Sequence, residues 1–168
     1  MIVEGGERVV LYGWHRAVYE IWQAKLADMK PVWYTGSESP TQKVESRAKF
    51  IAGESPIIFM SLRAGAGLDG LQHVCSTVVF GELDWSPGVH EQCLGRIYRD
   101  GQPNPVMCYH LVAEDGSDPI VAEVLGLKRE QVEGLRNPNA DLIEKLDAAG
   151  GHIAALAKRY LKSKAVAA

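Results

Sequence analysis

The sequence predicts an α/β fold: a parallel sheet with helices on both faces, followed by a small helical appendage at the C-terminal end. Three observations support this fold class. Short apolar runs alternate with segments of helical period, five times along the chain. Serine-proline and aspartate-proline pairs mark where helices begin. The alternation stops after about residue 128, where the pattern changes to two amphipathic segments.

Five apolar runs are expected to form buried strands. They are short and rich in β-branched and aromatic residues, which is typical of strands covered on both faces. Parallel strands bring their carboxyl ends to one edge of the sheet, and binding sites gather in the loops there. The loops after Tyr34, Met60 and Phe80 are therefore the first places to look for a site. The expected strands are residues 9–12, 32–34, 57–60, 77–80 and 106–112.

Four helices are expected between and after these strands. Apolar residues at helical spacing define the first of them, and a cap residue followed by proline begins the other three. The expected starts are Ala17, Ser39, Ser86 and Asp118, and the expected ends are Pro31, Gly53, about Asp100 and Gly126. Two further amphipathic helices are expected around Gly150-Gly151. We therefore divide the chain into a main domain, residues 1–128, and a helical C-terminal extension, residues 129–168.

Composition restricts the possible functions. The net charge is -3, so a strongly basic nucleic-acid-binding module is not indicated, and any such contact must depend on a few well-placed residues. The three cysteines are far apart and form neither a zinc motif nor a disulfide framework. No signal peptide or membrane span is expected, so we expect a cytoplasmic protein without a membrane partner, associated with the nucleoid in a bacterial or phage source.

The segment from Gln92 to Gln102 carries the clearest chemical pattern. On a continuous helix, Gln92, Arg96 and Arg99 are four and seven positions apart and share one face. Two guanidinium groups on one face repel each other unless an anion lies between them. Arginine binds phosphate through a planar fork of donors, and such groups stabilise a phosphoryl group during transfer. The alternative is a solvated basic helix face paired with carboxylates.

This segment resembles motif VI of Swi/Snf-type superfamily-two helicases, which reads Q-x-x-G-R-x-x-R-x-G-Q, and all six fixed positions are present. The stretch Met60–Leu71 resembles motif V of the same family, and Asp84-Trp85-Ser86-Pro87 resembles its D-W-N-P turn. Arg8–Trp14 matches motif IV only loosely and carries no predicted functional residue. The resemblance covers residues 7–127 and implies the second RecA-like domain of a DNA helicase or translocase.

The resemblance also implies roles on the nucleotide side. Arg96 and Arg99 would be arginine fingers that reach the γ-phosphate of ATP, which a first RecA-like domain holds together with Mg²⁺. Asp69 would contact either the ribose or motif VI. The remaining residues predicted on the nucleotide side are Gln92, Gly95 and Gly67.

On the DNA side, the motif V loop would hold a backbone phosphate through Ser61, Arg63 and Gly65. Trp85 would pack against a sugar or a base edge, and Thr35 and Ser37 are weaker candidates for phosphate contacts. Two alternatives remain open: the glycines only form a tight turn, and Trp85 is simply buried.

Two motifs of a complete motor are absent from the sequence. Neither the Walker A pattern G-x-x-x-x-G-K-[ST] nor a D-E-x-H box occurs. We therefore expect half of an ATP-driven motor, inactive alone, whose partner is a Walker-bearing first domain in the same or another polypeptide and whose track is DNA, expected to be duplex. The alternative is a non-catalytic RecA-like module that binds DNA or another motor. The intact arginine pair favours the first hypothesis.

Overall fold

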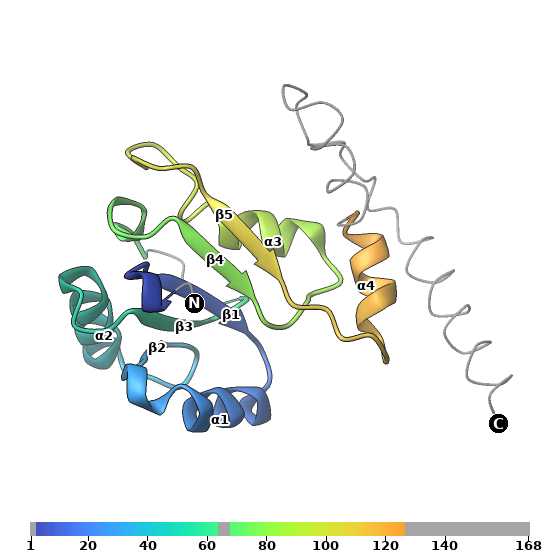
Figure 1. Ribbon diagram of the computed structural model, residues 1–168, viewed down its shortest axis with the longest axis horizontal. Coiled ribbons are helices and arrows are strands. Elements are labelled where there is room, and N and C mark those ends of the chain that lie inside the picture. The colour runs from blue at the N-terminus through green and yellow to red at the C-terminus, as the bar shows by residue number, and fades with distance from the viewer. Residues whose placement is uncertain (1–2, 64–67, 127–168) are drawn as a thin grey trace, which may run out of the picture. The chain divides into compact units, whose positions relative to one another are not determined.

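A computed structural model describes residues 3–63 and 68–126, and it contains a five-stranded parallel sheet with the strand order β2-β3-β1-β4-β5 (Figure 1). Every neighbouring pair in this sheet is parallel. The α/β fold class predicted from the sequence is confirmed. The strands are β1 (Val9–Gly13), β2 (Val32–Tyr34), β3 (Ile57–Ser61), β4 (Thr77–Phe80) and β5 (Met107–His110).

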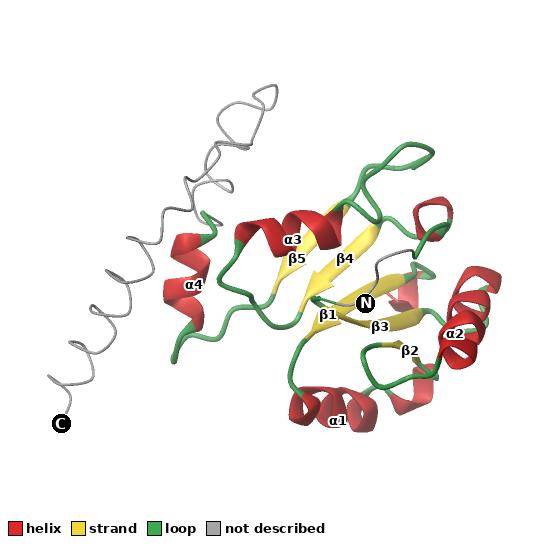
Figure 2. Cartoon of the chain, turned by 180° about the vertical axis from the view of Figure 1, so that it is seen from behind, coloured by secondary structure: helices red, strands yellow, loops and turns green. Residues whose placement is uncertain are grey.

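Four α-helices alternate with the strands or follow them. Because parallel crossovers are right-handed, the strand order places α1 on one face of the sheet and α2 and α3 on the other. Figure 2 shows α3 lying over β4 and β5. The α-helices are α1 (Arg16–Lys25), α2 (Pro40–Ala52), α3 (Pro87–Leu94) and α4 (Asp118–Val124). Short 3-10 turns occur at η1 (Val3–Gly5), η2 (Ala27–Met29) and η3 (Leu71–His73).

The two faces of the sheet are built from alternate residues of the strands. On one face, Leu11, Ile57 and Phe59 form an apolar cluster against which Trp22 of α1 packs. On the other face, Tyr12 stacks on Phe80 with ring centroids 5.3 Å apart. The hydroxyl of Tyr12 donates to the carbonyl of Cys93 in α3, at 3.1 Å, and its burial raises the pKa of the phenol. Strands β1 and β3 are therefore buried on both faces, as predicted, and β4 is mostly buried. The prediction of burial is wrong for β5, an edge strand on which Met107 and Tyr109 are exposed, and β2 is only half-buried.

Two glycines at the carboxyl ends of central strands make room for one tryptophan. A Cβ atom on Gly13 would lie 2.7 Å from the ring of Trp22, and one on Gly81 would lie closer still. A side chain at either position would displace the indole that covers the centre of this face.

Helix α2 begins and ends where the sequence predicts. The side chain of Ser39 accepts a hydrogen bond from the backbone N–H of Gln42, and the Gln42 amide accepts one from the N–H of Ser39. This reciprocal capping satisfies two backbone donors at the helix start. Gly53 ends the helix in the left-handed conformation, with φ of 82°.

Helix α3 is shorter than predicted, since it ends at Leu94 and not near Asp100. From Arg96 onward the backbone N–H groups bond mainly three residues back or fewer, which is the pattern of tight turns. Gly95 weakens the helix at this point. The carbonyl of Ile97, which would otherwise continue the helical ladder, accepts a hydrogen bond from the side chain of Gln102.

Two other elements, α1 and β5, are shorter than the sequence predicts. Helix α1 ends at Lys25, and the chain reaches Pro31 through a 3-10 turn with Lys30 in the left-handed conformation. Strand β5 is limited to four residues, Met107–His110, because only these pair with β4.

The chain forms two compact units. The first consists of Met1–Glu82 and Gly88–Leu111 and contains the whole sheet. The second consists of Leu83–Pro87 and Val112–Ala168, of which the structure describes residues up to 126, including α4. The predicted domain boundary at 128 and the predicted helices of residues 129–168 lie outside the described residues. Within the described ranges, no helix has the length and apolar character needed to cross a bilayer.

Candidate functional site

The motif VI-like segment leaves α3 and continues through a series of turns. Gln92 lies in the last turn of α3 and is exposed, whereas Arg96 and Arg99 follow the end of the helix. Arg96 is half-buried, and Arg99 and Gly95 are exposed. The predicted single helix face for Gln92, Arg96 and Arg99 is therefore wrong, because the helix ends before both arginines.

An ion pair joins the motif VI-like segment to the motif V-like segment. Nη1 of Arg99 lies 3.0 Å from Oδ1 of Asp69, and the two side chains are 45% and 64% exposed. The pKa of Asp69 is lowered, first by the backbone N–H of Gly70, then by the charge of Arg99 and by the amide of Gln72. Asp69 is thus an ionised partner of Arg99 at neutral pH, which corresponds to one of the two contacts expected for it.

Two residues that the sequence did not single out hold Asp69 in place. Nε of Arg47, on α2, donates to the backbone carbonyl of Asp69 at 2.7 Å. The buried side chain of Gln72 accepts from the N–H of Gly70 at 2.9 Å, and its amide lies 3.4 Å from Oδ1 of Asp69. Neither residue carries a sequence signal, since both are ordinary polar residues whose importance depends on tertiary contacts.

A second set of contacts anchors the turn that carries Arg99. The side-chain amide of Gln102 donates to the carbonyls of Cys75, at 2.9 Å, and Ile97, at 3.2 Å. Nδ1 of His73 lies 3.0 Å from the carbonyl of Gly101, whose φ of 84° favours glycine. Cys75 precedes β4, so this anchor lies at the amino end of that strand. The expectation that the site gathers at the carboxyl ends does not hold for this turn.

At the carboxyl end of β3, the predicted DNA-contacting residues differ in exposure. Ser61 is buried near Tyr19, whose pKa is raised mainly by burial. Arg63 is exposed, and its guanidinium lies over the ring of Trp14, 5.3 Å from the centroid. Of these two candidates, Arg63 is therefore the one placed to meet a ligand.

Of the two candidates after β2, Thr35 is bonded to an acidic neighbour, whereas the side chain of Ser37 is exposed. The hydroxyl of Thr35 donates to the carboxylate of Glu38, at 2.9 Å to Oε2, and the N–H of Thr35 donates to the same oxygen. The N–H of Ser37 donates to the hydroxyl of Thr35 at 3.3 Å. A phosphate at Thr35 would meet the negative charge of Glu38, so this arrangement disfavours Thr35 as a phosphate contact.

Trp85 belongs to the second unit. Its indole is 38% exposed, which leaves part of the ring accessible, and the neighbouring Asp84 accepts a hydrogen bond from the N–H of Ser86 at 2.9 Å. The remaining two candidates, Gly65 and Gly67, lie outside the described residues. Among residues 3–63 and 68–126, no three histidine, cysteine, aspartate or glutamate side chains are grouped as a metal site would require.

No protein-family model matches the chain, but individual curated proteins do. The SWI/SNF-related matrix-associated actin-dependent regulator of chromatin subfamily A-like protein 1 of Drosophila melanogaster is 26% identical over 135 residues, which cover 77% of this chain and 17% of that protein. Human helicase-like transcription factor is 30% identical over 112 residues, covering 63% of this chain and 11% of that protein. The chain therefore corresponds to less than a fifth of the length of these relatives.

Solved structures give the same answer for the fold. The crystal structure of the C-terminal part of the Fun30 ATPase domain superposes with a TM-score of 0.66 at 21% identity, covering 74% of this chain and 41% of that chain. The C-terminal domain of Dbp5 from S. cerevisiae gives a TM-score of 0.57 at 13% identity, covering 76% and 74%. Sequence and fold together confirm that this chain resembles the C-terminal RecA-like domain of Swi/Snf-type helicases.

Proposed function

We propose that the chain is the C-terminal motor half of a Swi/Snf-like, ATP-dependent DNA translocase or helicase. In this role it supplies Arg96 and Arg99 to ATP held by a Walker-bearing first domain, and it contacts the DNA backbone. The observation that supports this function best is the Asp69–Arg99 ion pair, because it connects the motif V-like and motif VI-like segments in the folded chain.

The arginines match the chemical needs of phosphoryl transfer. Negative charge spreads over the phosphoryl oxygens in the transition state, and a fixed guanidinium stabilises that state more than it stabilises bound ATP. Asp69 keeps Arg99 oriented while its charge is paired, and an arriving phosphate offers Arg99 a second anionic partner. Gln92 and Gly95 are both exposed and precede Arg96 in the sequence.

ATP and Mg²⁺ enter this proposal through the partner domain. The guanidinium groups of Arg96 and Arg99 suit phosphate oxygens, but the sequence contains neither a Walker A loop nor a D-E-x-H box. We therefore assign the metal and most of the nucleotide contacts to the first RecA-like domain. Mg²⁺ would neutralise phosphate charge there, and this chain would complete the site from the other side.

DNA, in duplex form, is the proposed track. Three of the predicted contacts have described side chains that are exposed, at least in part: Arg63, Trp85 and Ser37. Arginine neutralises phosphate charge, and tryptophan packs against sugars or base edges. We also propose a cytoplasmic setting, associated with DNA.

Reconstitution tests this function. The chain would be mixed with a Walker-bearing first RecA-like domain, and phosphate release would be measured with and without duplex DNA. We expect no release from the chain alone and DNA-stimulated release from the pair, which depends on Arg96. Steady phosphate release from the purified chain alone that is lost in Arg96→Ala would refute the assignment as half of a motor.

A non-catalytic role remains the second candidate, because the sequence has no Walker A loop and Arg99 already has a protein partner in Asp69. Such a module would bind DNA or another motor without completing an ATPase site. It predicts that Arg96→Ala and Arg99→Ala leave the turnover of any reconstituted pair unchanged.

A further inference from the structure

One peptide group beside the Asp69–Arg99 ion pair is held at both of its polar atoms. The carbonyl of Asp69 accepts a hydrogen bond from Nε of Arg47 at 2.7 Å. The N–H of Gly70 donates to Oε1 of Gln72 at 2.9 Å. The carbonyl and the N–H belong to the same planar unit, which joins Asp69 to Gly70. Two side chains, one from α2 and one from η3, therefore fix the orientation of this peptide plane.

The backbone has a second orientation open to it at this position. The φ and ψ of Gly70 are 88° and -6°, which are the values of the third residue of a type II turn. Such a turn converts to type I when its central peptide flips, and the third residue then has φ of about −90°. Glycine adopts both conformations readily. Local geometry alone thus permits a flip, and the contacts with Arg47 and Gln72 oppose it.

The orientation of this peptide decides what the carboxylate of Asp69 meets. The N–H of Gly70 is the first cause of the lowered pKa of Asp69, ahead of the charge of Arg99. A flipped peptide would turn this N–H away and bring a carbonyl oxygen, which repels a carboxylate, toward the side chain. The observed orientation therefore favours an ionised Asp69, whose Oδ1 lies 3.0 Å from Nη1 of Arg99.

Arg47 acts on the backbone and leaves the carboxylate to Arg99. Its Nε binds the carbonyl of Asp69, whereas Oδ1 of the same residue faces Arg99. A Cβ atom on Gly70 would lie 3.0 Å from Nη2 of Arg47, so a side chain there would press on the guanidinium. The half-buried arginine and the glycine therefore fit closely against each other, and the arginine reaches the peptide only because position 70 is bare.

Gln72 connects the same peptide to the turn at Gly101. Because its Oε1 accepts from the N–H of Gly70, its amide nitrogen faces Oδ1 of Asp69 and Nε2 of His73, each at 3.4 Å. Nδ1 of His73 lies 3.0 Å from the carbonyl of Gly101. Since a carbonyl only accepts, neutral His73 carries its proton on Nδ1, and its Nε2 can accept from Gln72. One network thus holds the peptide and the turn that carries the second arginine.

We infer that Arg47 is a positioning residue for Arg99, because it locks the Asp69–Gly70 peptide in the orientation that holds the Asp69 carboxylate against that guanidinium. The inference deepens the proposed function and rests on it for the role of Arg99 in ATP turnover. Arg47 lies in α2, outside the motif V-like and motif VI-like segments. The alternative is an ordinary surface arginine, which would affect neither the peptide nor turnover.

The first test measures amide hydrogen exchange in the full chain, without ATP or DNA. In Arg47→Ala, the N–H of Gly70 should lose about tenfold of its protection, because its peptide is then held on one side only. Arg47→Lys should keep most of the protection, since an ammonium group also donates to a carbonyl. The N–H of Gly53, bonded at the end of α2, should stay unchanged and reports that the helix is intact. Lys49→Ala is the matched control, because it removes another cation from the same helix.

The second test measures ATP turnover after reconstitution with a Walker-bearing first domain. Arg47→Ala should lower kcat about threefold and leave KM for ATP nearly unchanged, because the orientation of Arg99 matters in the transition state. The double variant Arg47→Ala/Asp69→Asn should lose no more than Asp69→Asn alone, since both changes act through one contact. Arg47→Lys should retain most of the turnover, and Lys49→Ala should retain all of it.

The outcomes that overturn the inference differ from those that overturn the proposed function. Unchanged exchange of the Gly70 N–H in Arg47→Ala refutes the lock and leaves the motor function standing. Losses in kcat that multiply in the double variant mean that Arg47 acts independently of Asp69, and they also refute the inference. Normal turnover in Arg47→Ala refutes it as well when Arg99→Ala abolishes turnover in the same motor. Normal turnover in Arg99→Ala would instead overturn the arginine-finger part of the proposed function, and the inference with it.

Discussion

The Asp69–Arg99 region and the Trp14–Arg63 region both present an exposed arginine, but different neighbours hold the two guanidinium groups. Arg99 faces a carboxylate at 3.0 Å, whereas Arg63 lies over the face of an indole. A carboxylate competes with phosphate for the same donors, so Arg99 has to share or exchange its partner when an anion arrives. An indole contact can persist while the edge of the guanidinium binds phosphate.

The two regions are also anchored at opposite ends of the strands. The turn that carries Arg99 is tied by Gln102 to Cys75, which precedes β4, whereas Trp14 follows the end of β1 and is held by Glu82. The comparison teaches that the two arginines are fixed near different ends of one sheet, Arg99 by an ion pair and Arg63 by contact with an indole. Variants should therefore separate phosphate chemistry from strand binding.

The largest effect is expected from the arginines of the motif VI-like segment. In a reconstituted motor, Arg96→Ala and Arg99→Ala should each reduce kcat by about 10³-fold, because a transition-state contact is lost, while ATP affinity falls much less. Arg→Lys should fail as well, since a point charge does not reproduce the planar fork. DNA-stimulated phosphate release is the measurement.

Asp100→Asn is the control for these variants, because it changes an exposed charge next to Arg99 without removing a guanidinium. Its turnover should stay near that of the wild type. Near-normal turnover in both arginine variants would refute the role of Arg96 and Arg99 as arginine fingers. Weakened DNA binding in these variants would show that the two regions do not act separately.

The second largest effect concerns the frame of the arginine turn. Gly101→Ala should reduce the free energy of unfolding by about 2 kcal/mol, because φ is 84° and the new Cβ would lie 2.8 Å from the ring of His73. Gly116→Ala is the matched control, with φ of 75° and no atom within 4 Å of the new Cβ. Urea denaturation should show a smaller loss for Gly116→Ala, and equal losses would mean that the His73 contact adds nothing.

DNA affinity of the isolated chain should be weak and sensitive to salt. An acidic chain with few phosphate contacts releases few counterions, so affinity should fall about five- to tenfold between about 50 and 150 mM salt. Anisotropy titrations with labelled duplex measure the slope of log affinity against log salt concentration. Arg63→Gln should reduce the magnitude of this slope by about 1, the amount that one lost phosphate contact removes. Tight binding that is independent of salt would contradict the assignment.

A smaller effect is expected for the partner of Arg99. Asp69→Asn keeps the size of the side chain and removes its charge, and we expect kcat to fall about threefold because Arg99 loses its orientation. Stability should change little, since an exposed ion pair contributes about 0–1 kcal/mol. Turnover and thermal unfolding of the same variant measure the two effects. A rise in kcat would instead mean that Asp69 restrains Arg99.

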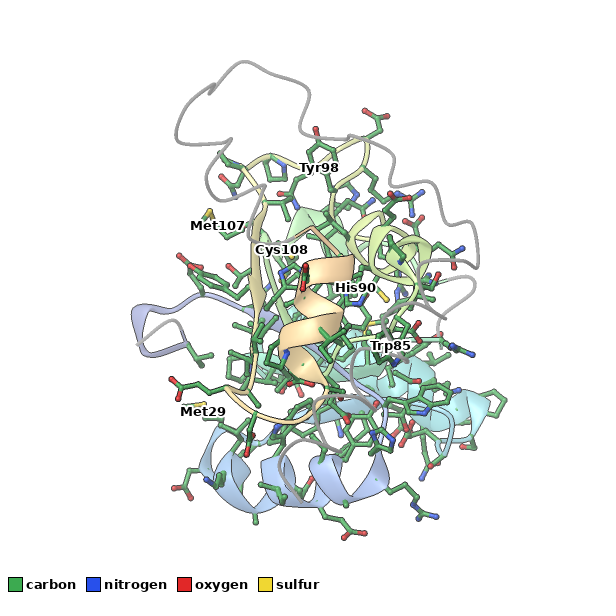
Figure 3. All side chains as sticks on the ribbon, turned by 90° about the vertical axis from the view of Figure 1, so that its right-hand side faces the viewer. Met29, Trp85, His90, Tyr98, Met107 and Cys108 are labelled. Carbon is green, nitrogen blue, oxygen red and sulfur yellow. The ribbon has the colours of Figure 1, made fainter. Side chains whose placement is uncertain are left out.

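The smallest effect concerns a histidine on β5 that takes part in neither the Asp69–Arg99 ion pair nor the Trp14–Arg63 contact. His110 stacks on Phe80 and lies near His90, and burial followed by the neighbouring His90 lowers the pKa of its imidazole from 6.5 to about 4. Figure 3 shows His90 and Cys108 on one side of β5 and Met107 on the other. The folded state therefore keeps His110 neutral between these two pKa values, whereas the unfolded chain is protonated there.

Because the unfolded chain binds the extra proton, stability should fall as the pH decreases from about 6.5 to about 4. His110→Phe should flatten this part of the profile of Tm against pH. A carboxylate whose pKa is lowered, such as Asp69, loses its contribution mainly as the pH falls through 3.8 and below, so its effect is concentrated at the acidic end of the profile. An unchanged profile in His110→Phe would show that this histidine does not control acid stability.

The sequence alone determined the strand positions, the limits of α2 and the identity of the motif residues. These features depend on neighbours along the chain: apolar runs form buried strands, and Ser39 caps a helix that Gly53 ends. The six fixed positions of the motif VI-like segment were likewise readable, because the spacing of the residues is itself the signal.

Tertiary structure decided which of these residues act together. Gly95 is a local signal for a weak point in α3, but it did not show that the helix ends at Leu94. The contact of Gln102 with Cys75, which accompanies this end, joins parts of the chain that only folding brings together. The hydrogen bond from Thr35 to Glu38 was missed for a different reason. In a loop, several hydrogen bonds compete for the same side chain, and the sequence does not show which of them forms. Asp69 and Arg99 are thirty residues apart, and only the closure of the chain around η3 and β4 brings opposite charges to 3.0 Å. Local propensity acts over a few residues, whereas such a contact exists only once packing has offset the entropy of closing the loop between its partners.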